Sequence, residues 1–260
     1  MIKQVSSDNK RILVFSDPHQ DAEKVKLILN KEDYDFAVCL GDWFDSHIKQ
    51  SATDLAATCS LVRQLPFKKN FLTLFGNHDL HYFFINRYAQ CSGYTDEKDA
   101  AITDMLHPNI AEIRDKFQWY VWIDDYLCTH AGIHPYFFPP NLKLTKEGIT
   151  AWLDAEIKKV KPTIESGGSH WFYRAGEARC GNQKFGGIVW LDFDEEFEPI
   201  EEVKQIVGHT FNRKGSGIRG HHTNGNLDLT EVNDLCIDCN VDEYLIIENG
   251  KVQIKKFADL

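Results

Sequence analysis

The feature that most constrains the fold is an alternation, in the first half of the chain, of short apolar runs with segments of helical periodicity. The runs at 11–15, 36–40 and 71–75 have the length and composition of buried strands. Between them, apolar residues recur at helical spacing over 25–29 and 55–65. Strands that alternate with helices in this way favour a parallel or mixed sheet covered by helices, which is an α/β (α+β) fold class.

The second half of the chain is richer in predicted strands. Residues 118–123 and 126–130 are typical of a hairpin. A second hairpin is indicated at 244–257, where Asn249-Gly250 favours a type I′ turn. Between the two hairpins, residues 145–161 have the periodicity of an amphipathic helix.

The length of 260 residues, 43% of them hydrophobic, is enough for one domain with a substantial core. We therefore expect a single domain over 1–260. Within it we expect a helical insertion at about 80–117 and a cap of loops and a helix at about 133–186.

Charge and cysteine usage narrow the functional classes. A net charge of −10 disfavours binding along nucleic-acid backbones, although a metal site can still attract a small anion. No apolar run has the length of a signal peptide core or a membrane span. Seven scattered cysteines do not suggest a disulfide framework, and Cys236 and Cys239 are interpreted as structural. We expect a cytoplasmic protein without a membrane or nucleic-acid partner.

Polar clusters rich in Asp, His and Asn follow the predicted strands, at least the first four of them directly. Ligands of open α/β sheets bind outside the carboxyl ends of strands, so these side chains are expected at one sheet edge. The clusters are Asp17-Pro18-His19, Gly41-Asp42-Trp43-Phe44-Asp45, Gly76-Asn77-His78-Asp79, His130-Ala131-Gly132 and Gly208-His209-Thr210.

These residue types suit two adjacent divalent metal ions. Imidazole and carboxylate are common ligands of zinc, iron and manganese. The two oxygens of Asp42 can bridge a pair of ions, and Asn77 adds an oxygen without charge. Two such ions, two carboxylates and a bridging hydroxide leave a site charge of about +1, which attracts phosphate. The ions also lower the pKa of bound water to about 7 in favourable cases.

His78 and Asp45 are candidates for acid catalysis. Ligation of one ion by both Asn77 and His78 would be sterically awkward, so the His78 imidazole is free to protonate a leaving oxygen. Asp45 lies three residues after Asp42 and can orient that ring. Any one of the motifs could occur by chance in an α/β domain, whereas the ordered set of five is hard to reach by chance.

The ordered motifs resemble those of the calcineurin-like metallophosphoesterases: D-x-H, G-D-x-x-D, G-N-H-D, H-A-G and G-H-T. The resemblance implies a two-sheet β-sandwich flanked by helices. It implies one metal held by Asp17, His19 and Asp42, and a second held by Asp42, Asn77, His130 and His209. It also implies His78 as catalytic acid, paired with Asp45. Manganese is the first expectation for both ions, with iron or zinc as alternatives.

The last motif narrows the resemblance, because Phe211 stands where many relatives have a further histidine. The set is most similar to the phosphoprotein phosphatase branch, which includes bacterial and phage Ser/Thr phosphatases and symmetrical diadenosine tetraphosphate hydrolases. That branch usually has a phosphate-binding Arg directly after G-D-x-x-D, where this chain has Ser46 and His47.

The missing arginine leaves the phosphate contacts to other residues. Arg174 follows Trp171 in a stretch that resembles a phosphate-binding element of the phage-type enzymes. The expected phosphate contacts are therefore Arg174, Asn77 and His47, with Arg179 and then Arg213 as alternatives.

Three functions remain open. The first is hydrolysis of a phosphate monoester, on a phosphoprotein or a phosphorylated small molecule, by a metal-bridging hydroxide with His78 as acid. The second is hydrolysis of a dinucleoside polyphosphate. The third is a non-catalytic scaffold on the same fold, which would be expected to lack ligands or the acid, whereas this chain has them all.

Overall fold

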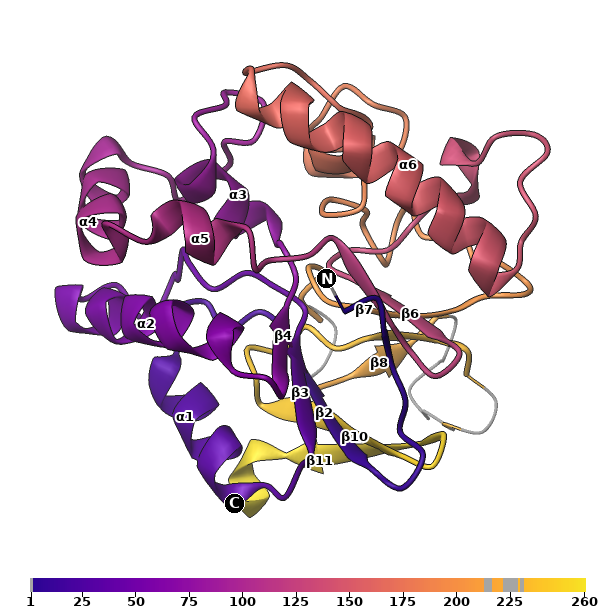
Figure 1. Ribbon diagram of the computed structural model, residues 1–260, viewed down its shortest axis with the longest axis horizontal. Coiled ribbons are helices and arrows are strands. Elements are labelled where there is room, and N and C mark those ends of the chain that lie inside the picture. The colour runs from indigo at the N-terminus through magenta and orange to yellow at the C-terminus, as the bar shows by residue number, and fades with distance from the viewer. Residues whose placement is uncertain (1, 213–216, 222–228, 230–231) are drawn as a thin grey trace.

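The computed structural model describes residues 2–212, 217–221, 229 and 232–260. Its strands form two mixed sheets packed face to face, with helices outside them (Figure 1). The sheet orders are β11-β10-β2-β3-β4 and β1-β5-β6-β7-β9-β8. This is the two-sheet sandwich flanked by helices that the sequence predicted.

The five-stranded sheet contains the three strands expected in the first half and the C-terminal hairpin. Strands β2, β3 and β4 are parallel, and β10 pairs antiparallel with both β2 and β11. The hairpin turns at Asn249 and Gly250, whose φ angles of 50° and 72° are those a type I′ turn requires. The strand bounds are β2 Arg11–Phe15, β3 Phe36–Cys39, β4 Phe71–Thr73, β10 Glu243–Glu248 and β11 Lys251–Lys256.

The six-stranded sheet contains the other predicted hairpin, β5–β6. Strands β6, β7 and β9 are parallel, so their carboxyl ends lie at one edge. The bounds are β1 Gln4–Val5, β5 Tyr120–Ile123, β6 Tyr126–Thr129, β7 Lys204–Val207, β8 Arg219–Gly220 and β9 Asp234–Cys236.

Alternation along β2 separates two cores. Ile12 and Val14 pack between the sheets, whereas Leu13 and Phe15 belong to the core under the helices. Successive strand residues face opposite sides, so a strand buried on both faces is apolar along its buried length, as residues 12–15 are.

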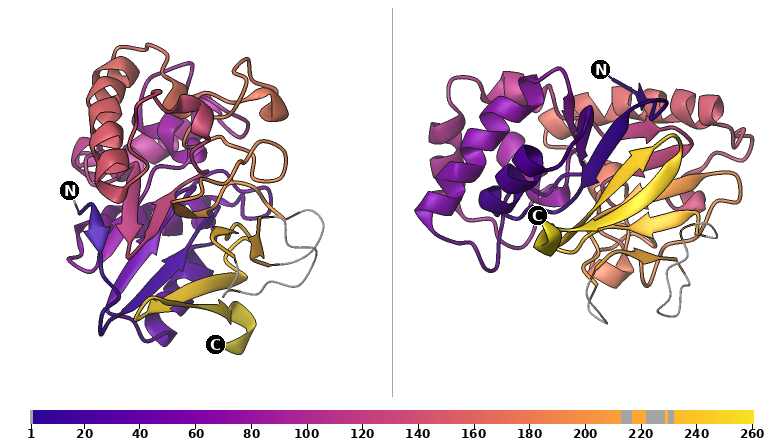
Figure 2. Two further views of the ribbon diagram at one scale, coloured as in Figure 1. Left: turned by 90° about the vertical axis from the view of Figure 1, so that its right-hand side faces the viewer. Right: turned by 90° about the horizontal axis from the view of Figure 1, so that it is seen from below.

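The helices lie on the outer faces of the sandwich (Figures 1 and 2). Helices α1, α2, α4 and α5 gather on one side, and α6 lies over the six-stranded sheet, where Trp122 donates to Thr150 and Tyr120 to Asp154. The bounds are α1 Ala22–Lys31, α2 Ala52–Gln64, α3 Asn77–Phe83, α4 Asp96–Leu106, α5 Ile110–Arg114 and α6 Lys146–Glu165. Short 3₁₀ turns cover Leu65–Phe67, Pro135–Phe137, Trp171–Tyr173, Glu177–Arg179 and Phe257–Asp259.

Helix α6 extends beyond its predicted end at residue 161, with Pro162 inside it. Ile164 is fully buried, and the Asn86 amide donates to its carbonyl, so packing and a cap hold the last turn. Among the described residues, no helix has both the length and the apolar character needed to cross a bilayer.

Candidate active site

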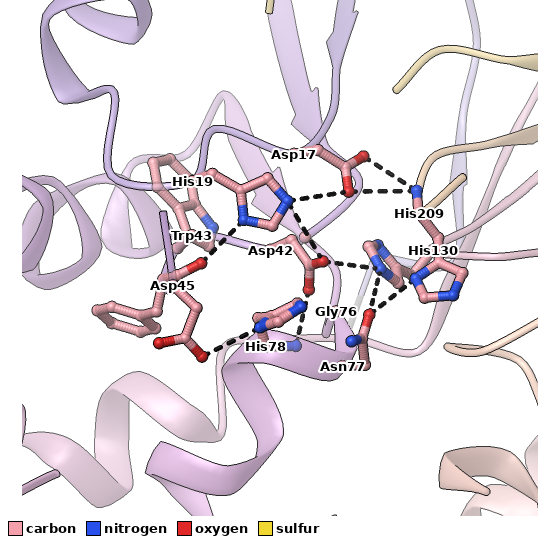
Figure 3. Close-up of polar contacts among 12 residues, drawn as sticks. Asp17, His19, Asp42, Trp43, Asp45, Gly76, Asn77, His78, His130 and His209 are labelled. Carbon is pink, nitrogen blue, oxygen red and sulfur yellow. Dashed lines mark hydrogen bonds and ion pairs between the residues drawn. The ribbon is translucent and has the colours of Figure 1, made fainter. Parts of the chain in front are cut away.

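Polar residues follow the carboxyl ends of six strands, three from each sheet, and converge on one cavity (Figure 3). All six predicted metal ligands and both predicted acid-catalysis residues lie in this cluster. By strand they are Asp17 and His19 after β2, Asp42 and Asp45 after β3, Asn77 and His78 after β4, His130 after β6, and His209 after β7.

The backbone at these positions is strained. Five of the residues have φ angles in the left-handed region, which costs a non-glycine residue about 1 kcal/mol or more and is concentrated at functional sites. They are Asp17 at 55°, His19 at 43°, Asp42 at 60°, Asp45 at 61° and His209 at 67°. The loops after β2, β3 and β7 therefore turn sharply, which brings these side chains back over the sheet edge.

Asp79 fixes the loops after β3 and β4 relative to each other. Its buried carboxylate accepts the backbone N–H groups of Asp42, Trp43 and Gly76 over 2.8–2.9 Å. Burial and the nearby Asp42 charge raise the pKa of Asp79 to about 7, despite these hydrogen bonds. A Cβ at Gly76 would lie 2.0 Å from Asp42 Oδ1, so glycine is required there. The sequence analysis assigned Asp79 no role, although it is the last residue of G-N-H-D.

Two histidines, His130 and His19, each point the lone pair of Nε2 toward the cluster. His130 Nδ1 lies 2.9 Å from the carbonyl of Leu40, and His19 Nδ1 lies 3.0 Å from that of Phe44. A carbonyl only accepts, so each Nδ1 carries a proton and donates. In a neutral ring, Nε2 is then unprotonated and free to ligate a metal, the arrangement typical of metal-binding histidines.

The atoms that face these Nε2 nitrogens are carboxylate oxygens, which are hydrogen-bond acceptors like the unprotonated nitrogens themselves. His19 Nε2 lies 3.8 Å from Asp17 Oδ1 and from Asp42 Oδ2, and His130 Nε2 lies 3.4 Å from Asp42 Oδ2. Bonds of about 2.0–2.2 Å to one ion place neighbouring ligand atoms roughly 3.0–3.5 Å apart. The His130–Asp42 spacing thus fits two donors around one cation, and the His19 spacings are about 0.3 Å wider than this range.

The donors fall into two sets that share one carboxylate. One set contains Asp17, His19 and Asp42, and the other contains Asp42, His130 and His209. Asn77 Oδ1 belongs beside the second set, 3.1 Å from His130 Nε2 and 2.9 Å from His209 Nδ1. If each set held one divalent ion, the two ions would lie side by side at the shared Asp42.

The buried carboxyl groups of Asp17 and Asp42 also favour a cation in this cluster. Asp17 and Asp42 are 0% and 1% exposed. Burial raises the pKa of Asp17, and the Asp42 charge adds to this. Burial opposes ionisation of Asp42, but nearby His130 and His78 hold its pKa well below the usual value. Burial likewise disfavours charging of His130, yet Asp42 raises the pKa of that ring to about 9. In the metal-free site, a proton therefore takes the place of a metal ion.

Asp238 is a further acidic residue that the sequence analysis missed. It follows β9, the sixth strand of the cluster, and lines the same cavity. It is 3% exposed, and its Oδ1 has no hydrogen-bond partner. Burial raises its pKa well above normal, and the charges of Asp17 and Asp42 add to this. The signal was present in the sequence, because Asp238 follows a short apolar run as the other site residues do.

His78 is held by Asp45 in the manner expected of an acid. Nδ1 of the ring donates to Asp45 Oδ2 over 3.0 Å. Burial lowers the pKa of His78, but Asp42 and Asp45 outweigh it and raise the pKa well above 6.5. Asp45 also accepts from His81, Tyr82 and Lys98 over 2.6–2.8 Å. Burial raises the pKa of Asp45, but the hydrogen bonds from His78, His81 and Lys98 outweigh it and lower that pKa. The His78 imidazole thus lies beside the donor sets (Figure 3).

The candidate phosphate contacts differ in position. The cavity of about 550 Å³ is lined by Asn77, by the exposed His47 and by Arg179. Arg179 is paired with Asp192 at 2.7 Å. Arg174 does not line this cavity: its guanidinium donates to Asn182 and lies 4.9 Å from the ring centre of Tyr88. Arg213 lies outside the described residues.

Comparison with known proteins agrees with this site. The sequence matches the calcineurin-like phosphoesterase family over residues 10–210, more than half of the chain. The chain therefore belongs to the calcineurin-like phosphoesterases and is a metal-dependent enzyme that hydrolyses phosphoester bonds. No curated protein sequence matches it.

Solved structures share the fold. A cold-active protein-tyrosine phosphatase from a psychrophilic Shewanella species superimposes with a TM-score of 0.58 at 16% identity, covering 100% of this chain and 81% of that one. A protein serine/threonine phosphatase from Saccharomyces cerevisiae gives a TM-score of 0.55 at 12% identity, covering 98% and 83%.

Proposed function

We propose that this enzyme hydrolyses phosphate monoesters, with His78 as general acid. The observation that supports this most directly is the position of His78. Its ring is held by Asp45 and lines the same cavity as both donor sets. An acid beside a pair of metal sites is what cleavage of an ester with a poor leaving group requires.

The chain's own residues bind and orient the reacting groups. Asp17 and His19 would hold one ion, Asn77, His130 and His209 the other, and Asp42 both. When bound, two divalent ions lower the pKa of water and so supply a hydroxide nucleophile near neutral pH. His78 Nε2–H gives its proton to the leaving oxygen, and Asp45 keeps Nδ1 protonated and the ring in place.

We propose Arg179 as the main phosphate anchor, in place of the arginine missing after the second motif. It lines the cavity beside His209, whose pKa burial and the Arg179 charge lower. Asp192 on one side of the guanidinium and the hydroxyl of Thr210, 3.3 Å from Nη2, hold the group in position. A fixed guanidinium can give parallel hydrogen bonds to two phosphate oxygens.

Manganese is our proposal for both ions. The combined sets contain carboxylate and amide oxygens with imidazole nitrogens and no sulfur among the described residues. Such mixed oxygen and nitrogen sets suit manganese, with iron or zinc as the alternatives.

An adjoining cavity supports a second candidate, hydrolysis of a dinucleoside polyphosphate. This cavity of about 670 Å³ shares Arg179 with the first and is also lined by Arg87, Tyr88 and Arg174. The guanidinium carbons of Arg87 and Arg174 lie 4.7 and 4.9 Å from the centre of the Tyr88 ring. Cationic groups beside an aromatic ring could receive further phosphates and a base.

A substrate panel with manganese separates the candidates. It contains an aryl phosphate, phosphotyrosine and phosphoserine peptides, a diadenosine polyphosphate and a phosphodiester. A monoesterase cleaves the aryl phosphate and at least one phosphopeptide with the highest kcat/KM. Highest kcat/KM on the diadenosine polyphosphate would replace the first candidate by the second, and preference for the diester would contradict both.

A further inference from the structure

A third group of metal-binding side chains lies next to the catalytic cluster. It contains Asp45, His78, His81 and Cys91, whose potential ligand atoms all lie within 4.8 Å of one another. None of these residues belongs to the two donor sets described above. Cys91 lies in the loop between α3 and α4, and it brings the only sulfur found in any of the three groups among the described residues.

The distances fit a tetrahedral zinc ion. Zinc bonds of about 2.3 Å to sulfur and 2.0–2.1 Å to nitrogen place the two ligand atoms roughly 3.5 Å apart. Cys91 Sγ lies 3.6 Å from His78 Nδ1 and 3.5 Å from His81 Nδ1. Asp45 Oδ2 lies 3.0 Å from His78 Nδ1 and 2.8 Å from His81 Nε2, so it supports the two rings from outside, and a water molecule can supply the fourth ligand.

The hydrogen bonds of His81 leave its Nδ1 unprotonated, as a metal ligand requires. Its Nε2 lies 2.8 Å from Asp45 Oδ2, and its Nδ1 accepts the backbone N–H of Cys91 at 3.3 Å. Nδ1 is therefore unprotonated and faces the thiol, while Nε2–H donates to a carboxylate. A carboxylate that orients a histidine in this way is the usual outer support of a zinc site.

The group is buried but reachable. His81 is 4% and Asp45 4% exposed, whereas Cys91 lines the cavity that contains Arg174 and Arg179. A zinc ion can enter from that cavity without crossing the catalytic donor sets. Cysteine with histidine is a soft ligand pair, which favours zinc over manganese.

We propose that Cys91, His81 and His78, with Asp45 as their outer support, form an inhibitory zinc site. Binding releases the thiol proton of Cys91 and the Nδ1 proton of His78 to solvent, and zinc takes their places. His78 is then a zinc-bound imidazole, a far weaker acid than the imidazolium it replaces. Zinc should thus slow hydrolysis most strongly for esters with poor leaving groups. This consequence rests on the proposed acid role of His78, whereas the site itself does not.

The site can be tested without substrate on the manganese-loaded enzyme. Cobalt is added as a spectroscopic substitute for zinc, and the near-ultraviolet thiolate-to-cobalt charge-transfer band is recorded. The wild-type enzyme and Cys180→Ser, which removes an exposed cysteine, should show the band; Cys91→Ser should not. Cys91→Ser should also weaken zinc binding at this site. Loss of a residue that only supports a ligand lowers metal affinity about 10- to 100-fold, and loss of the Cys91 ligand itself should lower it at least as much.

A second measurement needs no variant. Zinc should protect Cys91 from alkylation by iodoacetamide, followed by mass spectrometry, and leave Cys180 as reactive as before. Absence of the cobalt band in the wild-type enzyme, its persistence in Cys91→Ser, or unprotected Cys91 would each overturn the site. Because none of these readouts uses hydrolysis, their failure leaves the proposed function standing, and failure of the substrate panel leaves the zinc site standing.

Discussion

Nε2 of His130 lies 3.4 Å from Oδ2 of Asp42, while Nδ1 of the same ring donates to the carbonyl of Leu40 over 2.9 Å. The ring and the carboxylate are both fully enclosed, so a cation must lie between them or on the ring. In the metal-free protein that cation is a proton, and in the loaded protein it is a metal ion. Several measurable properties follow from this exchange.

The first concerns stability and pH. His130 has a pKa of about 9 in the folded metal-free protein, against about 6.5 for an unperturbed histidine. Its stabilising contribution is therefore complete below pH 6.5 and is lost as the pH rises through 9, by up to about 3 kcal/mol. Thermal unfolding in chelator should show Tm falling between pH 7 and 9, and two bound metals should remove most of this fall. An unchanged Tm across that range in chelator would contradict the assignment.

The second concerns the shared ligand. Asp42→Asn removes the charge that both donor sets use, so both ions should bind more weakly and turnover should nearly vanish. Metal content per chain after purification with manganese is the measurement. Asp234→Asn, a buried carboxyl on β9 outside the cluster, is the matched control and should keep both ions. Two full equivalents with normal turnover in Asp42→Asn would exclude the bridging role.

The third concerns the acid. His78→Ala should retain its metals and lose about 10²- to 10⁴-fold in kcat on an alkyl phosphate, the usual range for a general acid. The loss on p-nitrophenyl phosphate should be much smaller, because that leaving group departs without a proton. Equal losses on the two substrates would mean that His78 does not protonate the leaving group.

The fourth concerns the two arginines. Arg179→Lys should lower kcat/KM on an aryl phosphate about 10- to 100-fold, since hydrogen bonds to charged groups contribute about 1.5–3 kcal/mol. Inhibition by free phosphate should weaken in parallel. Arg174→Lys, outside the metal cavity, is the control and should change neither quantity. If Arg174→Lys produces the loss and Arg179→Lys does not, the anchor is the residue first expected from the sequence.

Local signals predicted most of the strands and helices, whereas the two-sheet sandwich was predicted from the resemblance of the motifs to a known family. Residues 12–15 are apolar on both faces of β2, and Asn249-Gly250 sets its own turn. The motifs also identified the residues that meet at the sheet edge, because a strand's carboxyl end places whatever follows it. Helix α6 was underestimated because Ile164 is held by tertiary packing, which no local pattern records.

The parts that the sequence did not predict depend on long-range geometry. Arg174 and Arg179 are five residues apart, and only the path of the loop decides which of them reaches the metal cavity. The contact of Cys91 with His78 and His81 likewise arises from the fold of the segment after α3. Asp79 acts through three backbone N–H groups from two loops, which spacing alone does not indicate.

We propose that two metal ions, shared through Asp42, are required for phosphoester hydrolysis by this enzyme. The most direct test strips the wild-type enzyme with a chelator and restores manganese in steps, while bound metal and hydrolysis of an aryl phosphate are measured on the same samples. We expect no turnover in the stripped enzyme and a rise in turnover that levels off at two manganese ions per chain. Full turnover in the stripped enzyme, or a plateau at a single bound ion, would contradict it.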